Sequence, residues 1–246
     1  MKPVAFDYAR AATPADVGAA RAIAGGQSLG PMLNLRLARP ERLVDIRRLP
    51  ALRFVREDAA GAAWGAATTH AEVEDGVAPD PTGGFLRGVA RSIAYRAVRN
   101  RGTVGGSLAH ADPAADWPVA LALVDAVAET SAGRRIPIAA LILGPFETVL
   151  QEGELLLAVH IPRPAAGTRH ARHKVVRKTG EFTQAMAGVR QGPQGTRVVL
   201  GAIDAAPQVL DGLVAAHDAV ACLSLPPHRR AMLAACLDRA AAEVGL

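Results

Sequence analysis

The sequence predicts an α+β protein, in which helices and strands follow one another without a regular alternation. Three observations lead to this fold class. Residues 85–96 carry apolar side chains at helical spacing, strand patterns dominate residues 155–203, and residues 211–246 are helical with a break at Pro226 and Pro227. A doubly wound parallel sheet would instead require repeated strand–helix–strand units. With 246 residues, the chain is long enough for one large domain or two modest ones.

The N-terminal part combines short elements with a glycine-rich segment. Thr13 and Pro14 predict the N-cap and the first position of a helix that reaches about Arg21. Residues 22–24 form an apolar strand that ends at two glycines, and residues 28–40 carry leucine and methionine at helical spacing. The expected order is therefore helix, strand, glycine turn and helical segment.

Strands and short helices alternate irregularly in the middle of the chain. Residues 54–57 and 62–70 are expected to pair through a glycine turn, and Thr69 with Glu72 forms the capping box of a short helix. Asp112 and Pro113 start a long apolar helix. The other expected pieces are a strand at 43–46, a helix at 114–123, a hairpin at 126–138, and strands at 155–161, 174–178, 185–190 and 198–203.

Composition and charge narrow the class of protein. Half of the residues are hydrophobic and 21% are charged, as expected of a folded globular chain. The net charge of +5 comes mostly from arginines scattered among acids, which is weak evidence for nucleic acid and suits an anionic cofactor or an acidic partner equally well. No secretory signal and no membrane span is recognisable, so we expect a cytoplasmic protein.

The sequence indicates neither metal ligands nor a catalytic nucleophile. Cys222 and Cys236 are too few for a disulfide framework, and no CxxC pair occurs to hold zinc or an iron–sulfur cluster. His170 and His173 lie on a probable strand, where residues three apart face opposite sides, so we expect a solvated basic face there. We therefore expect no metal and no catalytic residue in this chain.

Two glycine-rich segments are candidates for an anion site. Residues 25–30 read GGQSLG and residues 102–107 read GTVGGS, and neither matches the GxGxxG dinucleotide fingerprint. Where successive side chains are missing, backbone N–H groups can converge on phosphate oxygens. Two such loops, each flanked by hydroxyl residues, could hold one pyrophosphate. The alternative is that both segments are ordinary turns.

The sequence around both segments resembles a known family. Residues 24–29, AGGQSL, with Pro31 just beyond, are similar to the first FAD signature of the medium subunits of molybdenum hydroxylases. Residues 98–107, VRNRGTVGGS, and residues 111–116, ADPAAD, resemble the second signature. Comparable segments follow in the same order over residues 1–205. The chain is thus identified as a member of the family that includes the flavoproteins of carbon monoxide dehydrogenase and xanthine dehydrogenase.

The resemblance implies a two-part, PCMH-type FAD-binding domain followed by a small α+β domain with an antiparallel sheet. Residues 162–167 are rich in proline, glycine and alanine, as is typical of a linker. We therefore expect the FAD-binding domain over residues 1–165 and the second domain over residues 166–246. Between Ala12 and Ala22 the chain is shorter than the family's usual first helix.

The resemblance also implies which residues bind FAD. Main-chain amides of both glycine segments would bind the pyrophosphate. Asp116 would accept a hydrogen bond from a sugar hydroxyl, and Lys174 would stabilise the anionic reduced flavin and so raise its potential. Ile93 and Leu156 would line the site. The implied contacts are Ala24, Gly25, Gly26, Gln27, Ser28, Leu29, Ile93, Thr103, Val104, Gly105, Gly106, Ser107, Asp116, Leu156 and Lys174.

Each of these single residues also has an ordinary interpretation. Asp116 fits a carboxylate in the first turn of a helix, where the helix dipole stabilises it. Lys174 fits a solvated lysine on a basic strand, and Ile93 and Leu156 fit the hydrophobic core.

In a complex of this family, the chain would relay electrons through FAD to an external acceptor. The electrons would come from iron–sulfur clusters in a small partner subunit, while a large subunit with the molybdenum cofactor would oxidise the substrate; a dimer of such heterotrimers is one arrangement. Two alternatives remain: a free-standing flavin oxidase, for which the chain is short, and a basic binding protein whose glycine loops hold no ligand.

Overall fold

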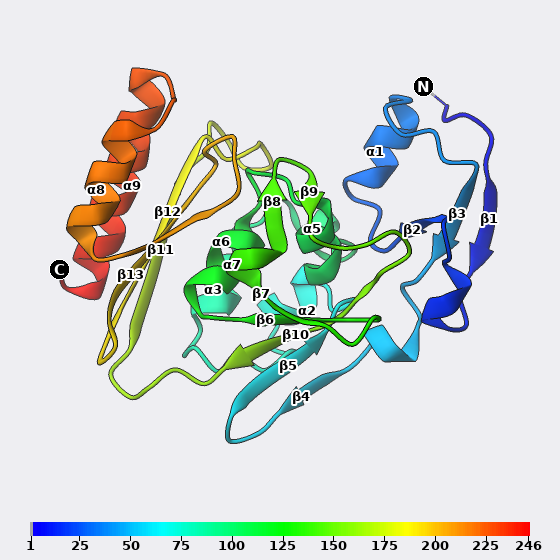
Figure 1. Cartoon of the computed structure of the whole chain (residues 1–246), viewed down its shortest axis with the longest axis horizontal. Helices are drawn as coiled ribbons and strands as arrows, with labels where there is room; N and C mark the ends of the chain where they lie inside the picture. Colours follow the sequence, from blue (N-terminus) through cyan, green and yellow to red (C-terminus); the bar gives the residue numbers. More distant parts are fainter. Residues whose placement is uncertain (1) are drawn as a thin grey trace.

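The computed structural model describes residues 2–246 and consists of three larger sheets and one two-stranded hairpin, with helices between and beside them (Figure 1). The N-terminal sheet is parallel, with the strand order β1-β3-β2. It stands at one end of the molecule together with helix α1 (Figure 1). The bounds are β1 Asp7–Arg10, β2 Arg21–Ile23, α1 Leu29–Asn34 and β3 Arg42–Asp45.

The central sheet is antiparallel and has the strand order β4-β5-β10-β6-β7. Its middle strand, β10, pairs with β5 on one side and β6 on the other, so it joins segments far apart in the chain. The bounds are β4 Val55–Glu57, β5 Gly61–Gly65, β6 Val127–Thr130, β7 Arg135–Pro137 and β10 Leu156–Pro162, with the small hairpin β8 Ile142–Gly144 and β9 Glu147–Thr148.

Six helices connect the central strands. The most deeply placed is α6, in which every residue is buried; beyond Asp116 at its start, its side chains are apolar on all sides, as is typical of an interior helix. The bounds are α2 His70–Glu74, α3 Phe85–Arg91, α4 Arg96–Arg99, α5 Val104–His110, α6 Asp116–Leu123 and α7 Ile138–Leu141; single 3-10 turns lie at Pro14–Asp16 and Pro50–Leu52.

The third sheet is an antiparallel meander in the order β11-β12-β13-β14, covered on its outer face by the two C-terminal helices (Figure 1). On its other face, β12 and β13 pack against α6. A separate cluster of buried apolar side chains lies between this sheet and the C-terminal helices. The bounds are β11 Arg169–Val175, β12 Ala185–Gly192, β13 Gly195–Gly201, β14 Gln208–Asp211, α8 Leu213–Cys222 and α9 Pro227–Val244.

The α+β class expected from the sequence is confirmed, and so are several local signals. Residues 21–23 form the strand before the first glycine segment, and β4 pairs with β5 through a glycine turn. The capping box at the start of α2 is present, because the Thr69 hydroxyl accepts from the Glu72 amide and the Glu72 carboxylate accepts from the Thr69 amide. β6 and β7 form the expected hairpin.

Several element boundaries differ from the prediction. The helical segment expected over residues 28–40 ends at Asn34, and the strand expected over 62–70 ends at Gly65. The helix expected from Pro14 to Arg21 is a single 3-10 turn, because Gly18 has φ +50° and the chain turns toward β2. The helix expected over 85–96 ends at Arg91, and Ala94 adopts φ +40° before α4 begins. The strand expected at 174–178 lies over 169–175, where its pairing with β12 is made.

None of the helices in residues 2–246 has both the length and the apolar character that crossing a membrane requires. Strands β1, β8, β9 and β14, which are two to four residues long, were not expected from the sequence.

Packing of α9 on the third sheet should contribute strongly to stability. Leu237 is fully buried between them, so Leu237→Ala should lower the free energy of unfolding by about 2–5 kcal/mol. Leu37, which is 72% exposed, offers the matched control, and Leu37→Ala should change the free energy of unfolding by less than about 0.5 kcal/mol. Urea denaturation of the full chain measures both, and equal effects would contradict this packing.

Candidate functional site

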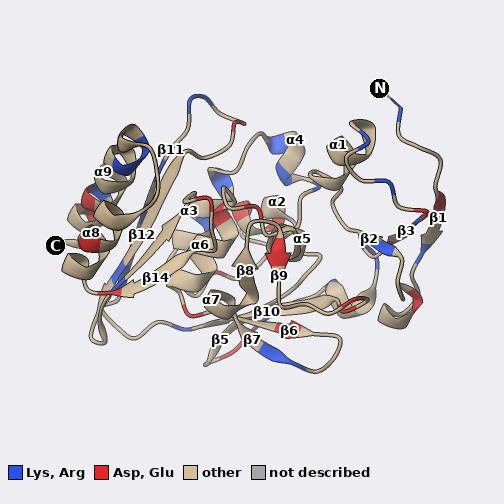
Figure 2. Ribbon diagram, turned by 45° about the horizontal axis from the view of Figure 1, so that its top comes forward, with Lys and Arg blue, Asp and Glu red and all other residues tan. Residues whose placement is uncertain are grey.

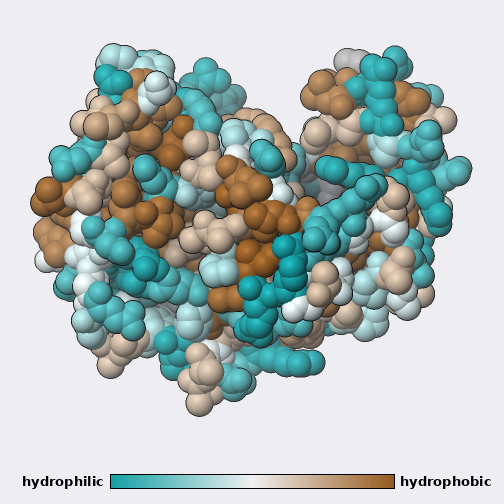
Figure 3. Space-filling model, viewed as in Figure 1, coloured by the Kyte–Doolittle hydropathy of each residue, from teal (hydrophilic) through white to brown (hydrophobic). Residues whose placement is uncertain are grey.

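A large cleft lies between the N-terminal sheet and the rest of the chain. Its volume is about 1230 Å³, and the surface is visibly hollowed there (Figure 3). Both glycine segments line it, as do Asp116 at the start of α6, Lys174 on β11 and Leu156 on β10. All three sheets therefore contribute to one cleft.

The two glycine segments touch each other at the floor of this cleft. A Cβ atom added to Gly25 would lie 2.0 Å from the carbonyl oxygen of Arg101, so no other residue fits there without moving the backbone. A Cβ on Gly106 would lie 3.7 Å from the Cβ of Ala24. The segments are far apart in the sequence, and the fold brings them together as the sequence analysis expected.

The first segment has the geometry of an anion site. It follows β2, turns at Gly26 with φ +71°, and enters α1. Within residues 2–246, the amides from Gly25 to Leu29 donate to no protein acceptor, although the Gln27 side chain donates to the Gly25 carbonyl at 3.2 Å. Free N–H groups at successive positions beside a cleft are suited to bind phosphate oxygens.

The second segment is built differently from the expectation. It is the first turn of α5, and most of its amides already have acceptors: Val104 donates to the Thr68 carbonyl at 3.0 Å and Gly105 to the Ala66 carbonyl at 2.9 Å. The Gly106 amide donates to the Thr103 hydroxyl as a helix cap. The side chain of Val104 is fully buried and does not line the cleft.

This second segment therefore offers a ligand fewer main-chain donors than the first. Ser107 lines the cleft, and its hydroxyl has no partner among the described side chains and carbonyls. Gly105 is required for packing, because a Cβ there would lie 2.5 Å from the Cβ of Ala66. In this structure, the second segment mainly holds α5 against the central sheet and supports the first segment.

A buried charge cluster forms the opposite wall of the cleft. Asp116 is 8% exposed and accepts from the Lys174 ammonium at 2.8 and 3.1 Å. The Arg172 guanidinium also donates to Asp116, and it donates to the Ser92 hydroxyl at 2.6 Å. The Lys174 ammonium further donates to the Ser92 carbonyl at 3.0 Å. Burial lowers the pKa of Lys174, and Asp116 opposes this effect.

Arg172 was not identified from the sequence. It lies two residues from Lys174 on β11, so both side chains project from the same face of the strand. That alternation was a usable signal, but residues 170–173 were interpreted as a solvated basic face, apart from the strand expected at 174–178, so Arg172 was not connected with Lys174. The two apolar candidates, Ile93 and Leu156, do line the cleft.

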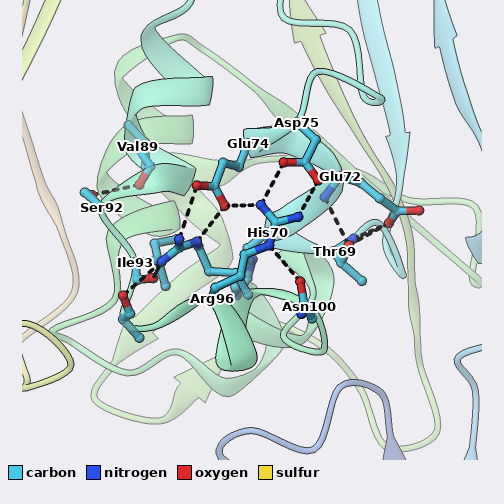
Figure 4. A network of polar contacts seen from close by, with 12 residues as sticks. Thr69, His70, Glu72, Glu74, Asp75, Val89, Ser92, Ile93, Arg96 and Asn100 are labelled. Carbon is cyan, nitrogen blue, oxygen red and sulfur yellow. Dashed lines mark hydrogen bonds and ion pairs between the residues drawn. The ribbon is translucent and has the colours of Figure 1, made fainter.

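A network of ion pairs fixes the segment that carries Ser92 and Ile93 (Figure 4). Glu74 of α2 and Asp75 just after it pair with the arginines of α4, and acidic and basic residues lie close together in this region (Figure 2). Glu74 accepts from Arg99 at 2.7 Å and from Arg96 at 2.9 Å, and Arg99 also donates to the Ile93 carbonyl at 2.9 Å. The loop between α3 and α4 is thereby tied to α2 beside the cleft.

His70 is a buried neutral imidazole at the edge of the cleft. Its Nδ1 accepts a hydrogen bond of 2.9 Å from the Trp117 indole, so a neutral ring carries its proton on Nε2. Burial is the main reason that the pKa of His70 is lowered to about 4, and the charge of Arg99 adds to it while Asp116 opposes it. His70 is therefore an uncharged hydrogen-bond donor at neutral pH.

The other histidines do not form a metal site. His170 stacks on the ring of Phe85 at a centroid distance of 5.3 Å, whereas His173 contacts Glu243 of α9 at 2.8 Å. They face opposite sides of β11, as expected for residues three apart, but His170 packs on an aromatic ring instead of facing solvent. Across residues 2–246, no group of three or more potential ligands could hold a metal ion.

Residues 2–164 match the family described as the FAD binding domain in molybdopterin dehydrogenase, and the chain belongs to this family. The membership expected from the sequence is thereby confirmed.

Individual relatives agree with this assignment. The chain is 40% identical over 193 residues to the 6-hydroxypseudooxynicotine dehydrogenase complex subunit alpha of Paenarthrobacter nicotinovorans, covering 74% of this chain and 65% of that one. It is 38% identical over 182 residues to the carbon monoxide dehydrogenase medium chain of Hydrogenophaga pseudoflava, covering 73% and 63%. The matched part thus spans less than two thirds of either relative.

The fold is also that of a solved relative. A chain in the structure of carbon monoxide dehydrogenase from Hydrogenophaga pseudoflava superimposes with a TM-score of 0.90 at 31% identity. The superposition covers 99% of this chain and 98% of that one, so the third sheet and its helices are included.

The neutral state of His70 predicts how stability depends on pH. A lowered pKa in the folded state means that the unfolded chain takes up the proton first, so stability falls as pH drops from about 6.5 toward 4. Between pH 7 and pH 5, the free energy of unfolding of the wild-type chain should therefore fall by about 2 kcal/mol more than that of His70→Gln.

Urea denaturation at the two pH values tests this. His228, which is exposed on α9, provides the control, because His228→Gln should leave the pH dependence as in the wild type. An unchanged pH dependence in His70→Gln would contradict a buried neutral His70.

Proposed function

We propose that this chain is the FAD-binding subunit of a molybdenum hydroxylase complex, in which it relays electrons through FAD to an external acceptor. The observation that carries the proposal is the row of five free amides, from Gly25 to Leu29, at the floor of the cleft in a chain of the FAD-binding family. These amides fit a pyrophosphate, which has several acceptor oxygens and no need for a specific side chain.

The dimensions of the cleft fit a cofactor of this size. Its volume of about 1230 Å³ exceeds the roughly 300–1,000 Å³ typical of small-molecule pockets. We propose that the first segment binds the pyrophosphate through its amides and that Thr103 and Ser107 complete the site with hydroxyl groups. In this proposal, Ala24 and Gly106 contribute the surface where the two segments meet, while Val104 acts through the core behind them.

The charge cluster would bind the sugar and flavin parts. A carboxylate has about four lone-pair positions, and Lys174 and Arg172 occupy about three at Asp116, so one remains to accept from a sugar hydroxyl. Lys174 would place positive charge beside the pyrimidine end of the flavin, and Ile93 and Leu156 would pack on its apolar surface. Bound FAD would supply the electron-transfer chemistry, and this chain would supply binding, orientation and charge.

The oxidoreductase activity would belong to the assembled complex. We propose two partners, a large subunit with the molybdenum cofactor and a small subunit with iron–sulfur clusters, and the names of relatives as a complex subunit and a medium chain support this. A dimer of heterotrimers and a cytoplasmic location are part of the same proposal. So is the division into an FAD-binding domain over residues 1–165 and a second domain over residues 166–246.

The proposal predicts that the full chain binds FAD. Titration with FAD, followed by quenching of flavin fluorescence, should give a saturable 1:1 complex with a flavin absorption spectrum, and the purified chain should contain no stoichiometric metal. A chain that stays colourless after FAD addition would overturn the proposal. Flavin reduction by an organic substrate without any partner would instead identify a free-standing flavin oxidase.

A single glycine should decide whether the amides are correctly placed. Gly25→Ala would put a Cβ 2.0 Å from the Arg101 carbonyl oxygen and push the two segments apart, so FAD affinity should fall at least about tenfold, or about 1.4 kcal/mol. Gly88→Ala in α3 is the matched control, because Gly88 does not line the cleft and no atom outside its chain neighbours and its own helix backbone lies within 4 Å of the added Cβ; its affinity should remain at the wild-type value. Equal affinities for both variants would show that the segments do not hold the cofactor.

A further inference from the structure

The cluster at the start of α6 contains more positive than negative charge. Asp116 is its single carboxylate, and both Arg172 and Lys174 donate to it. With all three groups ionised, the cluster carries a net charge of +1. Without Arg172, Lys174 and Asp116 would neutralise each other.

Arg172 is buried behind this pair. Its side chain is 6% exposed, and it does not line the cleft, whereas the Lys174 side chain is 15% exposed and does. Its guanidinium is fixed by the Ser92 hydroxyl at 2.6 Å and lies 3.2 Å from the sulfur of Met186. Its Nε atom is buried and has no hydrogen-bond partner among the described residues.

Such an arrangement is poorly explained by stability alone. Desolvating a guanidinium costs free energy, and buried ion pairs often contribute less than apolar side chains of the same size. One unpartnered buried N–H adds to this cost. What the geometry does provide is a positive charge, held by Arg172 close to Lys174 at the cleft. In a site of low polarity, the charge of Arg172 acts over several ångströms on whatever lies against Lys174.

We propose that Arg172 is a positioning residue that occupies Asp116 and leaves a net positive charge at Lys174, and so favours the reduced over the oxidised flavin. This inference rests on the proposed function. Two-electron reduction of the flavin with uptake of one proton adds one negative charge to the ring, whereas the oxidised ring is neutral. A positive cluster beside the cleft therefore stabilises the reduced form and has little effect on the oxidised form.

The test compares the affinity of the full chain for oxidised and for reduced FAD. Fluorescence titration gives the affinity for oxidised FAD. The affinity for reduced FAD follows from this value and from the midpoint potential of bound FAD, which is measured anaerobically with dithionite and redox dyes. Arg172→Met keeps most of the volume and removes the charge. We expect the ratio of reduced to oxidised affinity to fall roughly tenfold, and oxidised FAD to bind within about threefold of the wild type.

Two further variants separate charge from packing. Arg172→Lys restores the charge and should return the ratio to the wild-type value. Arg169→Met makes the same exchange on the same strand but at an exposed position, so it should leave the ratio unchanged. If Arg172→Met does not fold, Arg172→Gln keeps a donor for Asp116 without the charge and should show the same fall.

Equal changes in both affinities would mean that Arg172 is only structural, and this inference would be overturned. An unchanged ratio in Arg172→Met would overturn it as well. In either case the wild-type chain still binds FAD, so the proposed function would stand. Failure of the wild-type chain to bind FAD would instead remove the proposed function itself.

Discussion

At Gly25 the backbone approaches the carbonyl group of Arg101 so closely that only a hydrogen atom fits on the α-carbon. This contact joins the turn after β2 to the approach to α5, and the floor of the cleft exists because the two segments meet there. In the second segment, the Val104 and Gly105 amides donate to the carbonyls of Thr68 and Ala66, and these bonds anchor the segment to the end of the central sheet. It thereby supports the first segment, whose amides remain free. The second segment thus provides structural support, and the first segment provides free amides that can bind a ligand.

The third sheet completes the site from the opposite side. β11 places Arg172 and Lys174 against the N-terminus of α6, whose first residue is Asp116. α6 is buried along its whole length and packs on β12 and β13, so its start is held rigidly relative to β11. The charge cluster is therefore as well fixed as the hydrophobic core behind it. A cofactor in the cleft would contact elements from all three sheets.

The sequence predicts those features that depend on neighbouring residues. The glycine segments, the capping box at Thr69 and the hairpin of β6 and β7 each follow from a few consecutive side chains, and each is present. Arg172 could not be assigned in this way, because its significance arises from the register of β11 and from Ser92, far away in the chain. The hydrogen bonds of the α5 amides could not be predicted from the sequence either, because Ala66 and Thr68 become their acceptors only when the sheet and the helix pack together.

The free amides of the first segment also determine how this site can change in evolution. Every residue except proline carries the same N–H group, so the identity of Gln27 or Ser28 would contribute little to binding through main-chain hydrogen bonds. The strict requirement falls on Gly25, where a methyl group alone would separate the two segments. In the proposed site, binding of the cofactor would thus be encoded chiefly by a position that lacks a side chain, and a comparison that looks only for functional side chains would overlook it.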